Sequence, residues 1–174
     1  MSSNKGKDGE MDALISFATI AKSEEKFDLT RPTTTNTPDM GADIILEHEE
    51  HYIENTMIPL SKEKTPTIKK SSELDIKPKT AKTRVDIKTT EKKLQKDTIE
   101  KFIADTRKHP DCKNHMLIGG KDLTSPAKKL LNETNIDLEK DNKKLYYISN
   151  DGMKNINNHY KKLENKDKDS NKTE

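Results

Sequence analysis

The feature that most constrains this chain is its scarcity of large apolar side chains. Leu, Ile, Val and Phe together supply 32 of the 174 residues, about 18%, while 37% of the residues are charged. At this level, burial rarely offsets the conformational entropy lost when every residue is ordered. The composition therefore predicts a largely disordered chain with a small C-terminal α+β domain and short N-terminal amphipathic helices.

The net charge of +2 conceals an uneven distribution. Residues 1–60 hold five Lys or Arg against 12 Asp or Glu, whereas residues 61–174 hold 28 against 19. The two parts are therefore expected to meet different partners. Thirty of the 33 basic residues are Lys, which favours electrostatic attraction to phosphate over bidentate recognition of bases.

Residues 1–30 are predicted to form an amphipathic recognition helix with polar flanks. One face of this helix gathers apolar side chains at helical spacing, namely Leu14, Phe17, Ala18 and Ala21. Polar sequence on both sides leaves this stripe without a local core. We expect the four side chains to bind a partner protein, and the alternative is docking on the C-terminal part of the same chain.

Residues 31–90 are predicted to form a flexible linker, acidic at first and then basic. Residues 42–57 within it can form a short amphipathic helix, too short to indicate a coiled coil, so self-association stays open. Thr37 and Thr65 each precede a proline and are candidate phosphorylation sites, where a phosphate would add negative charge.

Residues 91–164 are predicted to form a small folded basic domain, followed by a disordered tail at 165–174. Pro126 follows Thr124 and Ser125, which is a typical helix start. The predicted elements are a helix at 94–103, a strand or turn at 115–120, a helix at 125–134, two strands around a polar turn within 136–149, and a helix at 153–163.

Motifs for metal binding or catalysis are incomplete. His48 and His51 stand three positions apart, whereas the zinc-protease pattern needs four, so a solvated helix face is expected there. His109, Cys112 and His115 supply at most three zinc ligands and are taken as ordinary turn residues. The glycine pair before Lys121 lacks the other residues of a phosphate loop. The sequence therefore predicts a protein that is not an enzyme and has no cofactor and no metal.

Several lysines and one tyrosine of the C-terminal part are candidates for contact with nucleic acid or with an acidic nucleocapsid surface. Such a set can equally well serve only to solvate a small domain. The candidate residues are Lys128, Lys129, Lys143, Lys144, Tyr146 and Lys161.

The stretch "HMLIGGKDLTSPAKKLL", residues 115–131, resembles the C-terminal domain of rhabdovirus phosphoproteins in its glycine pair, hydroxyl residue and Ala-x-x-Leu-Leu. The acidic N-terminal part, hydroxyl-rich middle and basic C-terminal part likewise resemble phosphoproteins of negative-strand RNA viruses. This resemblance implies a non-enzymatic polymerase cofactor that chaperones nucleoprotein, bridges it to the polymerase and binds nucleoprotein–RNA in viral transcription and replication.

The alternative function is a small DNA- or RNA-binding regulator. In such a regulator, the helix at 125–134 and a hairpin at 136–148 would form a winged-helix-like unit that contacts the nucleic acid. The single cysteine excludes an intramolecular disulfide, and no apolar run suggests a secretory signal or a membrane span. We therefore expect an intracellular protein of the cytoplasm, or of the host cytoplasm if the chain is viral.

Overall fold

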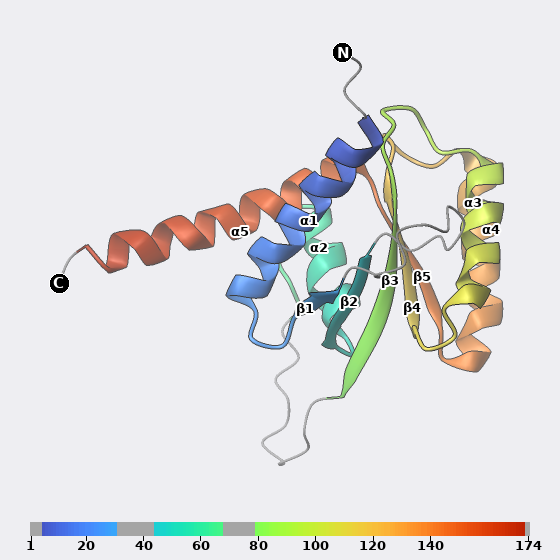
Figure 1. Ribbon diagram of the computed structural model, residues 1–174. Coiled ribbons are helices and arrows are strands. Elements are labelled where there is room, and N and C mark those ends of the chain that lie inside the picture. Colours follow the sequence, from blue (N-terminus) through green and yellow to red (C-terminus); the bar gives the residue numbers. More distant parts are fainter. Residues whose placement is uncertain (1–4, 31–43, 68–78, 173–174) are drawn as a thin grey trace.

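A five-stranded mixed β-sheet lies between two layers of helices in the computed structural model (Figure 1). The structure describes residues 5–30, 44–67 and 79–172. The main elements in chain order are α1 (Lys5–Ser23), β1 (Asp28–Thr30), β2 (Ile44–Glu49), η1 (Ile53–Met57), α2 (Ile58–Ser61), β3 (Thr80–Lys88), α3 (Lys96–Asp105), η2 (Thr106–Lys108), β4 (Asn114–Gly119), α4 (Ser125–Leu138), η3 (Glu139–Asp141), β5 (Lys144–Ile148) and α5 (Asn150–Ser170).

The prediction of a largely disordered chain with a small C-terminal α+β domain is wrong. The structure is a folded α/β domain to which the N-terminal part contributes α1, β1 and β2. The low apolar content is not a sign of disorder here, because the few apolar residues are concentrated on the faces of helices and strands that point inward. The helices place most of their polar residues on the outside, so two thin apolar layers suffice to cover both sides of the sheet.

The strands follow one another in the sheet in chain order, from β1 to β5. The pairs β1–β2 and β2–β3 are antiparallel, and the pairs β3–β4 and β4–β5 are parallel. Parallel neighbours need a crossover connection, which α3 and α4 provide. The carboxyl ends of β3, β4 and β5 consequently meet at one edge of the sheet.

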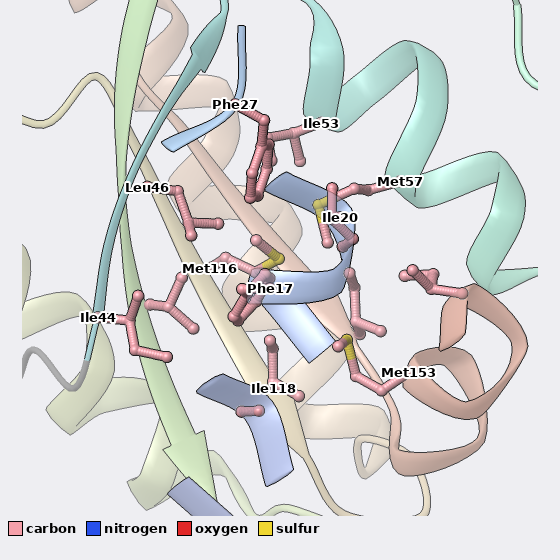
Figure 2. Packing of buried hydrophobic residues seen from close by; sticks show 14 of the residues in the cluster. Phe17, Ile20, Phe27, Ile44, Leu46, Ile53, Met57, Met116, Ile118 and Met153 are labelled. Carbon is pink, nitrogen blue, oxygen red and sulfur yellow. The ribbon is translucent and has the colours of Figure 1, made fainter. Parts of the chain in front are cut away.

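The larger core lies between the sheet and the layer formed by α1, α2 and α5. Phe17 and Ile20 of α1 are fully buried in it, against side chains of β2, β4 and α5 (Figure 2). Tyr160 of α5 is 1% exposed in the same cluster. The two ends of the chain therefore share one core, and α1 docks on its own protein.

The smaller core lies between the opposite face of the sheet and the helices α3 and α4. Its fully buried side chains include Ile99 and Phe102 of α3, Leu117 of β4 and Ala127 of α4. The predicted helices in this region match α3 and α4, because their apolar residues recur at helical spacing. Thr124 or Ser125 was expected to cap α4, and Thr124 occupies the N-cap position, although its side chain makes no capping hydrogen bond.

Three predicted elements within the described residues are wrong. Residues 44–49 form a strand instead of the start of a helix, because alternate residues Ile44, Leu46 and His48 point into the core. Residues 80–88 form the central strand β3 and are no linker. Residues 136–149 contain the end of α4, η3 and one strand, with Asn142 in a left-handed turn, instead of two strands.

The prediction of a disordered tail is wrong for part of its length. Residues 165–170 of the predicted tail continue α5 as a solvent-exposed helix that projects away from the sheet (Figure 1). The remainder of the predicted linker, residues 31–43 and 68–78, lies outside the described residues.

Candidate functional site

A carboxylate and an ammonium group are paired near the carboxyl end of the central strand β3. Val85 and Ile87 pack in the larger core, so the alternation of the strand turns Asp86 and Lys88 to its other face. Asp86 is 4% exposed, and the Lys88 Nζ lies 3.0 Å from the Asp86 Oδ1. A buried carboxylate is costly without a partner, and this ammonium group supplies one.

Lys88 stands at the edge of the sheet, where it is within reach of both faces. Its partner on β4 is Gly119, the last residue of that strand. Lys88 lines a groove of about 480 Å³ between α1 and α5, and also a second hollow of about 420 Å³ beside α3. In open α/β sheets, ligands bind outside the carboxyl ends of the strands. The Asp86–Lys88 pair is therefore placed where such folds hold their ligands.

The α1/α5 groove combines an apolar floor with charged walls. Ile87 and Ile118 of the sheet and Met153 of α5 form apolar parts of its surface. Its charged residues are Asp12 from α1, Lys88 and Glu91 from the end of β3 and the loop after it, and Lys154 and Lys161 from α5. Charges of both signs suit a ligand that is itself part anionic and part apolar.

The Asp86–Lys88 pair offers chemistry for phosphate groups. A carboxylate oxygen is a ligand that Mg²⁺ prefers, and Mg²⁺ commonly uses only one or two carboxylates, together with water and substrate phosphate oxygens. A lysine ammonium acts as a point charge on phosphate. Within residues 5–30, 44–67 and 79–172, no group of three or more His, Cys, Asp or Glu side chains is placed to hold a metal ion. A cation at Asp86 would therefore need ligands from its substrate.

The predicted partner-binding residues of α1 do not form an exposed stripe. Phe17 is fully buried in the larger core, and Leu14 and Ala21 pack partly buried against it. Ala18 is exposed. The large apolar side chains that α1 does expose are Met11 and Ile15, which are 55% and 59% exposed.

The predicted nucleic-acid-binding residues are not brought together as one patch. Lys128 and Lys129 lie on α4, while Lys144 and Tyr146 lie on β5 and Lys143 directly precedes that strand. Lys128, Lys129 and Lys144 are each within 4 Å of an acidic side chain, namely Asp122, Glu133 and Glu54. Lys161 alone of the set lines the α1/α5 groove.

His48 does not lie on a solvated helix face, as the sequence suggested. It is a fully buried residue of β2, and its Nδ1 lies 2.6 Å from the carbonyl oxygen of Glu49. Because a carbonyl only accepts, Nδ1 carries the proton, and Nε2 accepts from the Thr83 hydroxyl at 2.6 Å. Burial lowers the pKa of His48. His51, by contrast, is largely exposed.

Cys112 and His115 are buried, whereas His109 is half-buried. Burial raises the pKa of the Cys112 thiol to about 11. Burial, and then the nearby Arg84 charge, lower the pKa of His115 to about 3. Arg84 donates from Nε to the His115 Nδ1 at 3.1 Å and from Nη2 to the Phe102 carbonyl at 3.2 Å. His115 is therefore a neutral imidazole and Cys112 a protonated thiol, and both side chains pack in the interior of the protein.

The predicted phosphorylation sites fall in different parts of the chain. Thr65 is exposed, after α2. Thr37 lies outside the described residues.

Sequence reasoning missed Asp86 and Lys88, although a signal was present. The stretch "RVDIK", residues 84–88, alternates polar and apolar residues with the period of a half-buried strand. The lysines and threonines around this stretch give the segment the composition of a linker. A carboxylate and a lysine two positions apart on a strand share one face, which is the feature that could have identified the pair.

Comparisons of the chain with protein-family models, with curated proteins and with solved structures found no match. None of the helices in the described part of the chain has the length and apolar composition that a membrane-spanning helix requires.

Proposed function

We propose that this protein hydrolyses phosphodiester bonds of nucleic acid at the carboxyl end of β3. The observation that carries the proposal is the pairing of the buried Asp86 carboxylate with Lys88, which itself lines two hollows. The excess of lysine after residue 60 supports a polyanionic substrate, because clustered positive charge attracts phosphate backbones.

In the proposed reaction, Asp86 would hold a divalent cation together with substrate phosphate oxygens, and this cation would supply Lewis-acid polarisation of the phosphate. A water oxygen forms a new bond to phosphorus and gives a proton to solvent. The bond from phosphorus to the leaving oxygen breaks, and that oxygen takes a proton from solvent. Lys88 releases Asp86 and donates to a phosphate oxygen, which offsets the charge that develops there.

The test is cleavage of labelled single-stranded DNA, double-stranded DNA and RNA by the full chain with Mg²⁺ or Mn²⁺. Asp86→Asn and Lys88→Gln should each lower the rate by about 100-fold or more. Asp105→Asn is a matched control. Asp105 is also a buried carboxylate with a lysine nearby, since the Lys108 Nζ lies 3.0 Å from its Oδ1, but Asp105 belongs to α3 and not to the candidate site. Absence of wild-type cleavage, or full activity of Asp86→Asn, would overturn the proposal.

This proposal departs from the expectation that the chain is not an enzyme, which no observation tests. The polymerase-cofactor role and its nucleoprotein or polymerase partner likewise stay predictions, as does the cytoplasmic location. For the alternative regulator, residues 136–148 provide no hairpin, because β5 pairs in parallel with β4. Nucleic-acid binding itself remains compatible with the proposed reaction.

A further inference from the structure

We infer that the α1/α5 groove holds a single strand of the nucleic acid, with its phosphates along α5 and its bases toward the apolar floor. This inference rests on the proposed function, because it identifies how the substrate reaches Lys88. The residues that line the groove include Lys88 at the end of β3, Thr19 of α1 and Lys161 of α5.

The α5 wall of the groove presents polar side chains at a regular spacing. Lys154, Asn157 and Lys161 are separated by three and then four residues, so they lie on one face of the helix. Seven residues of α-helix span about 10 Å, a length that a nucleic-acid strand covers in about three nucleotides. Two lysines at this spacing can contact phosphates of one strand.

The two lysines of this wall lie farther from protein carboxylates than Lys128 of α4 and Lys144 of β5 do. Lys161 makes no ion pair within residues 5–30, 44–67 and 79–172, and Lys154 is 4.0 Å from Asp151 with both side chains largely exposed. Such an exposed pair is worth little. Lys128, in contrast, lies 2.9 Å from Asp122. The ammonium groups on α5 are therefore the more available for phosphate.

The opposite wall and the floor determine the orientation of the strand. Asp12 on α1 carries negative charge, which repels phosphates toward α5. Ile15, which is 59% exposed, and the half-buried floor residue Ile87 offer apolar surface, whereas Ile118 below them is buried. Only unpaired bases have free faces for such contacts, because the bases of a duplex are stacked on one another. The chemistry of the groove therefore favours a single strand.

The inference is tested by binding of fluorescent 15-nucleotide single strands and of the matching duplex to the full chain without divalent metal. Lys154→Ala/Lys161→Ala should weaken single-strand binding by about 10-fold or more, and should reduce the slope of log Kd against log salt by about 1.4. The matched control is Lys128→Ala/Lys129→Ala on α4. Thermal melts of both double variants should equal that of the wild type, because all four side chains are exposed.

The outcomes separate this inference from the proposed function. Unchanged binding by Lys154→Ala/Lys161→Ala, or an equal loss in the α4 control, would overturn the groove assignment, even if the wild type cleaves. Tighter binding of the duplex would overturn the single-strand assignment. Binding that depends on Lys154 and Lys161, in a protein that cleaves nothing, would support the groove and overturn the proposed reaction.

Discussion

The hydroxyl groups of Tyr52 and Tyr160 lie 2.6 Å apart, although 108 residues separate them in the chain. Tyr160 donates a hydrogen bond to the Glu24 Oε1 at 2.9 Å. This chain of hydrogen bonds joins the segment after α1, the segment after β2 and α5. Three parts of the chain that the sequence assigned to separate units are therefore connected through one partly buried set of hydrogen bonds.

Loss of the Tyr160 hydroxyl is expected to destabilise the whole fold. Burial raises the pKa values of both tyrosines, so both hydroxyls stay protonated near neutral pH. Tyr160→Phe leaves the half-buried Tyr52 hydroxyl and the Glu24 carboxylate without this partner, which should cost about 1–3 kcal/mol of unfolding free energy. Urea unfolding followed by circular dichroism measures it.

The control for this variant is Tyr146→Phe. Tyr146 is half-buried, and its hydroxyl makes no hydrogen bond to any described residue. Its removal should therefore change the unfolding free energy by less than about 0.5 kcal/mol. Equal effects of the two variants would mean that the Tyr52–Tyr160 contact contributes nothing specific.

Helices were predictable from this sequence because their signals are local. The apolar residues of α3, the N-cap and proline of α4, and the periodic face of α5 can each be recognised within a few turns. The sheet was not predictable in this way, because β2 pairs with a strand more than 30 residues away. The candidate site was missed with it, since Asp86 and Lys88 acquire their burial and pairing only in the sheet.

Phe17→Ala tests whether α1 belongs to the protein's own core. Phe17 is fully buried, and truncation of a buried Phe to Ala typically costs about 3–5 kcal/mol. A loss of this size in the unfolding free energy is expected. Ile15→Ala, on the exposed side of the same helix, should cost far less. If Phe17→Ala unfolds at the same urea concentration as the wild type, α1 is not part of the cooperative core.

Acid should destabilise the protein through His48 and His115. Both have lowered pKa values in the folded state, whereas an unfolded histidine binds a proton below about pH 6.5. The unfolded state therefore takes up more protons as the pH falls from 7 to 5, and the unfolding free energy decreases. Each histidine contributes at most about 1.4 kcal/mol per pH unit below pH 6.5.

The histidine contribution can be separated from that of other groups with variants. His115→Gln should show a shallower decrease in unfolding free energy between pH 7 and 5 than the wild type. His51→Gln is the comparison variant, because it replaces a histidine whose side chain is largely exposed. A slope that is the same in all three proteins would show that His115 does not titrate differently in the folded and unfolded states.

Gly119→Ala should disturb the edge of the sheet at which Lys88 lies. Gly119 has a φ of 135°, a conformation that side chains rarely adopt, and a Cβ there would collide with the backbone carbonyl of Lys88. Backbone strain of this kind costs about 1–3 kcal/mol, and the collision adds to it by pushing β3 and β4 apart.

We expect Gly119→Ala to have a lower melting temperature than the wild type. If the proposed reaction is correct, we also expect a larger loss of cleavage than the stability change alone explains. Cleavage measured well below the melting temperature, where Gly119→Ala is folded, makes the distinction. Wild-type cleavage in that folded variant would mean that the position of Lys88 at this edge does not matter for the reaction.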